Sequence, residues 1–305
     1  MGCPANINSE GADNISREKL GFFLGIVGMC LFAGTLPATR LAVIGLDPWF
    51  LTVARAAIAG CTALVVIFVM RRRFPPRELW LDIIAAGFCS VVCFPLFAAL
   101  AMVTLPATHG GIVQGILPLA TAAAATMIAH ERPSAGFWWT SAIGAIIVTT
   151  FVFRQSGGIE FSSGDIFLIG TVIAGAIGYT LSGRLAVHMP GWEVISWQVI
   201  VFLPFSALAT LALWPADIAG VPAASWGGLA YAGFISQFAA FCVFNAALAK
   251  GGISRIGQIM LLQPFVILWL ALFVNNEPID IENIFFAAAV VATVLIGRRM
   301  RIIQR

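Results

Sequence analysis

The sequence predicts an all-α integral membrane protein with ten transmembrane helices, arranged as two inverted repeats of five helices each. Three observations predict this fold: the composition, the number of apolar runs, and a set of motifs that occurs twice. Of the 305 residues, 60% are hydrophobic and 10% are charged, whereas about 25% of the residues in an average soluble domain are charged. A water-soluble protein cannot bury that much apolar surface, so we expect this chain to lie in a lipid bilayer.

Ten apolar runs come close to the length of about 20 residues that a helix needs to cross a bilayer. They are expected at 20–43, 49–70, 79–101, 107–129, 136–153, 165–187, 192–214, 225–248, 252–274 and 281–297. The predicted organisation is a cytoplasmic tail at 1–19, a first repeat at 20–153, a linker at 154–164, a second repeat at 165–297 and a basic cytoplasmic tail at 298–305.

Three motifs recur in the same order in both halves of the chain, between 144 and 148 residues apart. They are Arg-Leu-Ala-Val at Arg40–Val43 and Arg184–Val187, Ala-Ala-Leu-Ala at Ala98–Ala101 and Ala246–Ala249, and a proline 13 positions before a glutamate at Pro118 and Pro264. Transporters that work by alternating access are commonly built from two related halves around a site near the membrane midplane. The repeat therefore favours a transporter.

The basic residues predict the orientation, because Lys and Arg concentrate on the cytoplasmic side of membrane proteins. With the N-terminus inside, 14 of the 17 Lys and Arg residues fall on that side, and only Arg40, Arg55 and Arg154 remain for the outer half. Both termini are thus expected in the cytoplasm, with the protein in a bacterial inner membrane. Five helices per half is an odd number, so the two halves would enter the membrane in opposite senses.

These features resemble the drug/metabolite transporter superfamily, in particular its EamA branch, over about residues 20 to 300. The ten helices in five-plus-five form, Glu-Arg-Pro-Ser at Glu131–Ser134 and Gln-Pro-Phe at Gln263–Phe265 carry the resemblance. The second half has Asn-Glu-Pro at Asn276–Pro278 and lacks the arginine. The resemblance implies a central cavity lined by the first four helices of each half, with the fifth at the periphery. It also implies secondary transport of a small metabolite, with family tendency favouring export.

Polar side chains inside the predicted helices are the candidates for substrate binding, because a charge at a helix centre costs about 2.5–3.5 kcal/mol on insertion scales. Arg55 could neutralise a substrate carboxylate or phosphate, or it could pair with Asp47 or with carbonyl groups freed at Pro37. The candidate set is Arg55, His109, Gln114, Tyr179, Gln237, Asn245, Gln258 and Gln263.

The glutamines of this set lie in equivalent helices of the two halves. Gln114 shares a helix face with Pro118, and Gln263 directly precedes Pro264, which leaves a carbonyl group unpaired one turn earlier. Polar groups beside broken helices often form transporter sites. Each glutamine alone could instead be an interhelical contact, worth about 0.6 kcal/mol on average. The set together favours a cavity.

Prolines and paired arginines are the candidates for moving parts. Pro37, Pro118 and Pro264 interrupt predicted helices and could act as hinges. Arg40 and Arg184 match each other in the repeat but would face opposite membrane surfaces, so they could close alternate ends against acids such as Asp47 or Glu193. Contact with lipid headgroups is the alternative for both arginines.

Several classes of function find little support in the sequence. No nucleotide-binding loop, catalytic dyad or metal-ligand spacing occurs, so we expect no enzyme activity, cofactor or metal. No Asp or Glu lies near the middle of a predicted helix, so His109 is the candidate if transport is coupled to protons, and uncoupled transport fits equally well.

The expected partners are a small-molecule substrate and the lipid bilayer. A net charge of +3 gives no reason to expect nucleic acid, and a homodimer is left open. The alternatives to a metabolite transporter are a receptor or scaffold without flux, an intramembrane enzyme, and a transporter of nucleotide sugars or phosphorylated compounds. The last would need more basic groups in the cavity than Arg55.

Overall fold

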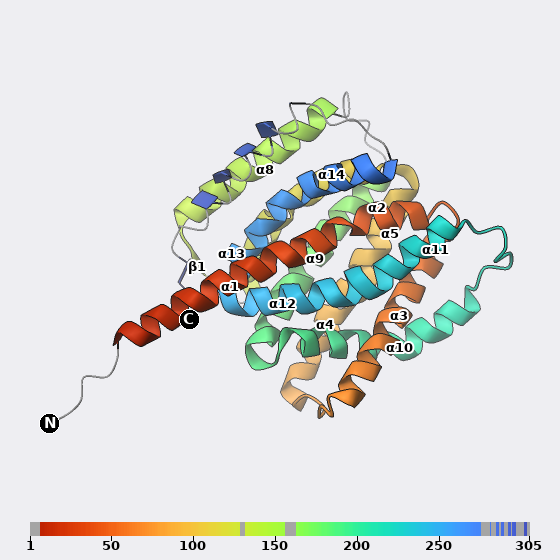
Figure 1. Cartoon of the computed structure of the whole chain (residues 1–305), viewed down its shortest axis with the longest axis horizontal. Coiled ribbons are helices and arrows are strands. Elements are labelled where there is room, and N and C mark those ends of the chain that lie inside the picture. The colour runs from red at the N-terminus through yellow and green to blue at the C-terminus, as the bar shows by residue number, and fades with distance from the viewer. Residues whose placement is uncertain are drawn as a thin grey trace.

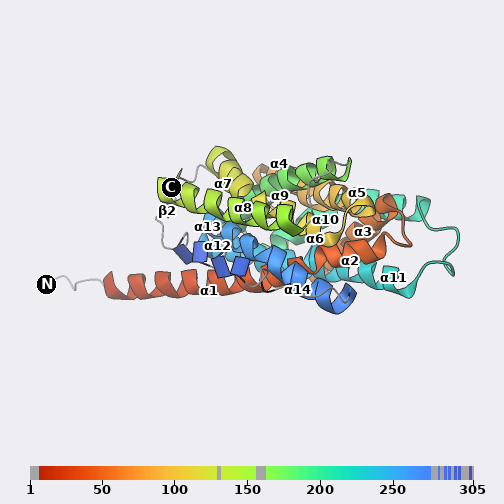
Figure 2. The ribbon, with the colours of Figure 1, turned by 90° about the horizontal axis from the view of Figure 1, so that it is seen from above.

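Helices make up nearly all of the described chain and lie side by side in one elongated bundle (Figures 1 and 2). The computed structural model describes residues 7–128, 132–155, 163–275, 281, 285–286, 288–289, 292–293, 295–296 and 302–303. Within these residues the one departure from helix and turn is a two-residue antiparallel pair, β1 (Arg132–Pro133) with β2 (Ile302–Ile303).

Among the described residues, seven helices are long and apolar enough to cross a membrane. They correspond to seven of the predicted spans and run over Arg17–Ala42, Pro48–Val69, Arg77–Thr104, His109–Ile128, Ser163–His188, Gly191–Ala212 and Ala223–Gly251. Shorter apolar helices at Ala135–Ile147 and Arg255–Leu270 coincide with the predicted spans 136–153 and 252–274. The predicted span 281–297 falls mostly outside the described residues.

The first half contains α1 to α8. They are α1 (Ile7–Ala33), α2 (Thr35–Ala42), α3 (Pro48–Val69), α4 (Trp80–Gly87), α5 (Phe94–Thr104), α6 (Ala107–Val113), α7 (Leu117–Ile128) and α8 (Ala135–Gln155), with a short 3₁₀ turn Arg77–Leu79 before α4. The helix α1 begins at Ile7, well before the predicted start of the first span, and its N-terminal part extends beyond the bundle in both ribbon views. Asp47 starts α3 by accepting hydrogen bonds from the backbone N–H groups of Trp49 and Phe50.

The second half contains α9 to α14, followed by residues of which only short pieces are described. The helices are α9 (Ser163–His188), α10 (Gly191–Ala212), α11 (Ala223–Ala230), α12 (Ala240–Gly251), α13 (Ile253–Gly257) and α14 (Gln263–Asn275).

The two halves pack against each other in a reciprocal pattern. The first span of each half lies against the third span of the other: α1 packs on α12, and α9 packs on α5. The second spans pack together as α3 and α10, and the fourth spans meet where α7 contacts α13 and α6 contacts α14. Equivalent spans of the two halves therefore meet each other in both directions across the contact between the halves.

Backbone irregularities also recur at equivalent places. The third span of each half contains a π-helical segment, Phe88–Cys93 between α4 and α5 and Tyr231–Ala239 between α11 and α12. The fourth span of each half contains a 3₁₀ segment, Gln114–Ile116 between α6 and α7 and Gln258–Leu262 between α13 and α14. Pro118 and Pro264 each occupy the second position of the helix that follows.

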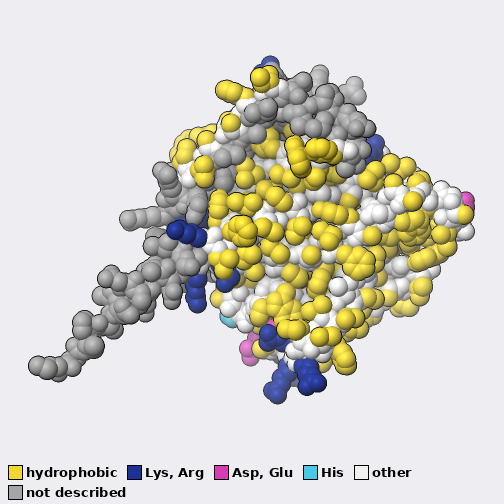
Figure 3. Space-filling view, viewed as in Figure 1, with side chains coloured by type: hydrophobic (Ala, Val, Ile, Leu, Met, Phe, Trp, Pro, Cys, Tyr) yellow, Lys and Arg dark blue, Asp and Glu magenta, His cyan; other side chains and the backbone are white. Residues whose placement is uncertain are grey.

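The surface is apolar over most of the face shown in Figure 3, and the basic side chains gather towards one end of the bundle. At that end Arg255 lies 3.0 Å from Glu18, Arg184 lies 3.3 Å from Asp82, and Arg72 lies 3.7 Å from Glu193 (shortest N–O separations). These pairs join α1 to α13, α4 to α9, and the chain between α3 and α4 to the first turn of α10. We call this the basic end, and the other the opposite end.

Candidate functional site

Arg55 is a buried charge inside the helix bundle. It lies two turns into α3, its residue is 2% exposed, and its Nη2 donates a hydrogen bond of 3.1 Å to the Ser236 hydroxyl. Its Nε has no hydrogen-bond partner. The expected partners were wrong: Asp47 caps the start of α3 instead, and no backbone carbonyl near Pro37 accepts from Arg55.

Both halves supply the hydroxyl groups next to this charge. Ser236, in the π-helical segment of the second half, also shares a 2.7 Å hydrogen bond with the hydroxyl of Thr35. Thr35 is the first residue of α2 in the first half. We call Arg55, Thr35 and Ser236 the Arg55 cluster, and all three are nearly inaccessible to solvent.

The two π-helical segments are joined beside the Arg55 cluster. Gln237 follows Ser236 and donates from Nε2 to the backbone carbonyl of Ser90 over 3.2 Å. The Gln237 Oε1 and the Ser90 hydroxyl are buried and have no partner. Because a π-helical turn disrupts the regular backbone ladder, such segments are frequently found at functional sites. Here one lies in each half, and an amide side chain connects them.

A break in the first span positions Thr35. The helix α1 ends at Ala33, and Gly34 separates it from α2. The Tyr231 hydroxyl, at the start of the second π-helical segment, donates 2.8 Å to the carbonyl of Leu31. A Cβ atom on Gly34 would lie 2.9 Å from Cε1 of the same tyrosine ring, so only glycine fits there. Pro37, a predicted hinge, is buried in α2 just past this break.

Aromatic side chains lie about one turn along the chain from Thr35 and Ser236, within the same two spans. Phe32 precedes Thr35 by one turn, and Phe241 follows Ser236 at the start of α12. Their ring centroids are 4.8 Å apart, and Tyr179 of α9 lies 6.0 Å from Phe241 and 5.2 Å from Phe244. Tyr179, a member of the candidate substrate-binding set, is therefore part of a buried aromatic cluster contributed by both halves.

The structure brings together one glutamine pair of the predicted set. Gln263 Nε2 lies 3.4 Å from Gln114 Oε1, which links the fourth spans of the two halves beside Pro264 and Pro118. Gln258 is turned towards α8 instead, where it donates 2.9 Å to the Ser141 hydroxyl and 3.5 Å to that of Thr140.

Asn245 is separated from the rest of the predicted set. Its Nδ2 donates over 3.4 Å to the carbonyl of Gly191, the first residue of α10. Gln237 and Asn245 are both in the candidate set, but they bond to different spans. Asn245 thus lies towards the basic end, whereas Gln237 joins the π-helical segments.

The arginines predicted to close the two ends have other partners than expected. Arg184 pairs with Asp82, and Glu193 is held by Arg72, so the predicted pairing of Arg184 with Glu193 is wrong for this structure. At the opposite end Arg40 donates to the carbonyls of Met102 and Val103 at the end of α5, and not to Asp47.

His109 lies at the opposite end, at the start of α6. Its Nε2 is 2.8 Å from Asp165 Oδ1 in the first turn of α9, with side chains 14% and 9% exposed. Because α6 and α9 belong to different halves, this contact ties the fourth span of the first half to the first span of the second.

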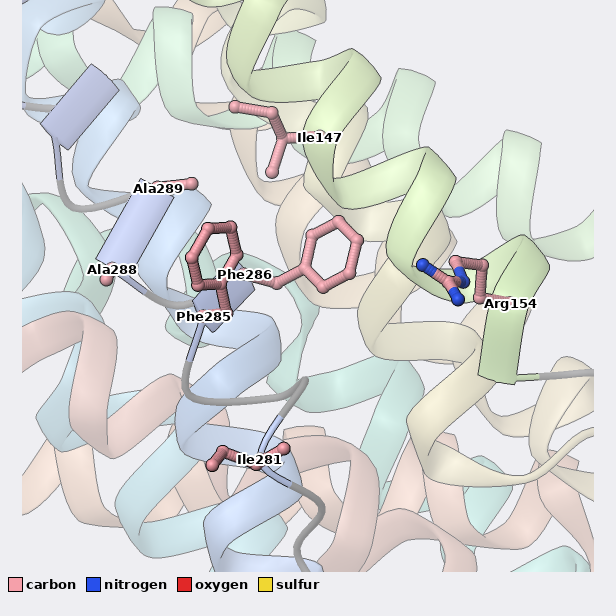
Figure 4. Close-up of a pocket in the computed structure, with 7 residues that line it drawn as sticks. All are labelled: Ile147, Arg154, Ile281, Phe285, Phe286, Ala288 and Ala289. Carbon is pink, nitrogen blue, oxygen red and sulfur yellow. The ribbon is translucent and has the colours of Figure 1, made fainter.

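The surface pockets described next lie apart from the Arg55 cluster, because Arg55, Thr35 and Ser236 do not line them. A groove of about 690 Å³ lies between α8 and residues 281, 285–286 and 288–289, and Figure 4 shows Phe285, Phe286 and Ile147 lining it with Arg154 at one side. A second apolar groove of about 480 Å³ runs over α3, α10 and α11. A polar basin of about 710 Å³ at the basic end is lined by Arg71, Arg72, Arg73, His188 and Glu193, among others.

Sequence reasoning missed the neutral and acidic partners in these contacts. Thr35, Ser90 and Ser236 are small polar residues of a kind common in membrane helices, and nothing in their local sequence distinguishes them. Asp165 sits near a helix end, where an acid is unremarkable. The one signal available was that Ser236 stands directly before Gln237 in a predicted span.

Apolar helices in two interlocking halves, with polar groups buried between them, define a multi-pass membrane protein of the kind that moves solutes. The chain belongs to the EamA-like transporter family, which matches it twice, over residues 19–154 and 162–297. The predicted resemblance to the EamA branch is therefore confirmed, and so is the duplication within the chain.

Two known proteins extend this assignment. The chain is 36% identical over 289 residues to the "Uncharacterized transporter YdeK" of Bacillus subtilis (strain 168), which covers 93% of this chain and 99% of that protein. A solved structure titled "Crystal structure of protein" superposes with a TM-score of 0.72 at 16% identity, covering 92% of this chain and 98% of that chain. The second similarity shows a shared fold.

Proposed function

We infer that this protein is a secondary transporter that exports a small metabolite, an amino acid or related amphiphilic compound, by alternating access. The observation that carries this proposal is the Arg55 cluster. A buried charge with incomplete hydrogen bonding lies where the halves meet, beside two π-helical segments and a broken helix. Transporter sites commonly form at discontinuous helices near the repeat interface.

Ten membrane spans in two inverted repeats, with both termini in the cytoplasm of a bacterial cell, complete the proposed architecture. Its support is the reciprocal packing of the first and third spans and the position of the basic end. The helix α1 contacts Arg255 at that end through Glu18. Because Lys and Arg concentrate on the cytoplasmic side of membrane proteins, we propose that the basic end faces the cytoplasm. Fluorescent and periplasmic reporter fusions at each terminus test this orientation.

The proposed motion uses the irregular segments as hinges. The 3₁₀ segments before Pro118 and Pro264 lie next to the contact between Gln114 and Gln263. A bend there in each half would separate the fourth spans at one end and close them at the other. In the state described, ion pairs join the halves at the basic end and the contact between His109 and Asp165 joins them at the opposite end.

Flux through liposomes tests the proposed function. The purified protein would be reconstituted into vesicles loaded with a mixture of amino acids, hydroxy acids, nucleosides and vitamins, and release would be followed by mass spectrometry against protein-free vesicles. We expect protein-dependent release of at least one compound. If compounds stabilise the protein thermally but none is released, the protein is a receptor and the proposed function is wrong.

A matched pair of variants tests the position of the site. Thr35→Val removes the hydroxyl that bonds to Ser236, and Thr39→Val removes a buried hydroxyl without a partner from the same helix. We expect Thr35→Val to slow release severalfold and Thr39→Val to leave it close to the unmodified rate. Equal effects of the two variants would contradict a site at the Arg55 cluster.

A further inference from the structure

We propose that the transported compound is a net monoanion, a small carboxylate with an apolar body, and that the membrane potential drives it outwards. This proposal rests on the proposed function and adds to it the charge of the substrate and the source of energy. It is carried by the charge balance around Arg55, by the hydrogen-bonding capacity left in the cluster, and by the adjacent aromatic rings.

Arg55 brings a positive charge into the interior of the helix bundle. A guanidinium group stays protonated in proteins, and removing it from water without a counter-charge is strongly unfavourable. Among the described residues no carboxylate is bonded to Arg55. The described acids at the span ends have other contacts: Asp47 caps α3, Asp82 and Glu193 pair with arginines, and Asp165 pairs with His109. Among the residues that the structure describes, the Arg55 cluster therefore carries one positive charge without a counter-charge.

Two hydrogen-bonding groups at the site, Arg55 Nε and Gln237 Oε1, have no partner in the structure. The planar fork of arginine matches the two oxygens of a carboxylate. Here Nε has no partner and Nη2 donates to a neutral hydroxyl. The neutral acceptor Gln237 Oε1, on the residue after Ser236, also has no partner and suits a hydroxyl or similar donor. A phosphate dianion would need more than this single cation, and the ammonium of an amino acid would meet no acid.

Aromatic side chains supply an apolar surface in the same spans as Thr35 and Ser236. The aromatic cluster of Phe32, Tyr179, Phe241 and Phe244 includes residues of the same two spans, three residues before Thr35 and five residues after Ser236. A compound held by its carboxylate at Arg55 could lay an apolar body against these rings. The chemical class that fits is a monocarboxylate such as a 2-hydroxy acid with a branched or aromatic side chain.

The driving force follows from the charge of that substrate. The cell interior is negative, so a monoanion leaving the cell moves down the electrical gradient, by about tenfold in concentration for each 60 mV. Export of this kind needs no proton-carrying carboxylate at the midplane. The described residues contain no such carboxylate bonded within the Arg55 cluster.

The experiment compares compounds that share a carbon skeleton but differ in charge. Vesicles containing the protein would hold 3-phenyllactate and 2-hydroxy-4-methylpentanoate as monoanions, and phenylalanine and leucine as zwitterions. Potassium gradients with valinomycin would set the potential at zero or 60 mV, inside negative. We expect the hydroxy acids to leave at least tenfold faster than the amino acids, and their final inside-to-outside ratio to fall about tenfold when the potential is applied.

Variants assign the effect to Arg55. Arg55→Gln keeps a polar side chain without the charge, and should reduce hydroxy-acid release at least tenfold, while the small remaining release still depends on the potential because the substrate is an anion. Arg55→Lys keeps the charge without the fork, and should retain the dependence on potential at a lower rate. Arg154→Gln, which changes an arginine at the end of α8 away from the cluster, is the control and should release at the unmodified rate. Monodisperse elution and a cooperative thermal transition would show that each variant folds.

The outcomes separate this inference from the transport function. Faster release of the amino acids, or release that ignores both the potential and Arg55→Gln, would overturn the monoanion proposal and leave transport standing. If no compound is released, thermal stabilisation of the purified protein by the hydroxy acids shows whether an anion site exists. Stabilisation that Arg55→Gln abolishes would keep the anion site and reject transport, and its absence would overturn the anion site as well.

Discussion

The two halves share their backbone irregularities but not their polar chemistry. Each third span has a π-helical segment and each fourth span has a 3₁₀ segment followed by proline. Arg55 on α3, however, corresponds in position to Gln198 on α10, when both are counted from the tryptophans near the starts of these helices. Gln198 bonds to Ser182 within its own half, over 3.0 Å, whereas Arg55 reaches across to Ser236 in the other half.

This difference separates the parts that move from the part that recognises the substrate. A motion that opens the two ends in turn needs equivalent hinges in both halves, so the irregular backbone is expected in both. A small substrate has no such symmetry, so its charged group needs only one partner. The positive charge in one half and the neutral amide in the other fit a substrate that binds in one orientation.

The largest difference between the halves should appear in stability when each polar residue is replaced by methionine. Arg55→Met removes an unpaired buried charge and should raise the thermal unfolding midpoint by about 3 °C while abolishing transport. Gln198→Met removes the hydrogen bond from Nε2 to Ser182, together with an Oε1 that has no partner, and should lower the midpoint by about 1 °C. Differential scanning fluorimetry in detergent measures both. If Arg55→Met is destabilised by several degrees, the charge has a compensating partner and the comparison fails.

The hinges should behave alike in the two halves. Replacing Pro118 and Pro264 together with alanine restores a backbone hydrogen-bond donor at both 3₁₀ segments, and should slow transport by about tenfold without changing the yield of folded protein. Each single replacement should give a similar, smaller loss. A full loss from one single variant and none from the other would show that only one half bends, and unchanged flux in the double variant would remove the hinges altogether.

The hydrogen bond from Gln237 to the Ser90 carbonyl, which joins the two π-helical segments, can be tested with a control variant at Ser90. Gln237→Leu leaves the Ser90 carbonyl without its donor and should destabilise the protein by about 1 kcal/mol. Ser90→Ala removes an unpartnered hydroxyl from the same residue but keeps that carbonyl bond, so it should change stability by less than about 0.5 kcal/mol. Unfolding in mixed detergent compares the two. A larger effect from Ser90→Ala would mean that the hydroxyl has a role that its contacts do not show.

The sequence could predict what depends on neighbouring residues. Seven spans, the doubled motifs and the unusual charge at Arg55 were all visible, because apolar run length and a charge within it are local properties. The interruptions at Pro118 and Pro264 were visible for the same reason, since proline lacks the backbone donor. The break at Gly34 was visible too, through Pro37, which has no backbone N–H to donate to the carbonyl of Ala33, where α1 ends. The π-helical segments, which contain no proline, were not predicted.

Contacts between distant residues could not be predicted. Arg55 and Ser236 are 181 positions apart, and His109 and Asp165 are 56 positions apart. Several acids and hydroxyls near the ends of spans could have served equally well as partners, which is why Asp47 and Glu193 were expected and Ser236 and Asp82 were found. The repeat identifies which spans are equivalent, but it does not say which side chains of facing spans meet.

The smallest expected effect concerns the basic end, where exposed ion pairs join the halves. The Arg184 and Asp82 side chains are 43% and 27% exposed, and exposed pairs of this kind contribute only about 0–1 kcal/mol. Arg184→Asp should therefore change the rate of transport by no more than about threefold. Adding Asp82→Arg should restore the rate, while adding Glu193→Arg should not, because Glu193 lies with Arg72 on the neighbouring connection. Rescue by Glu193→Arg instead would mean that the end rearranges during transport and pairs Arg184 differently in another state.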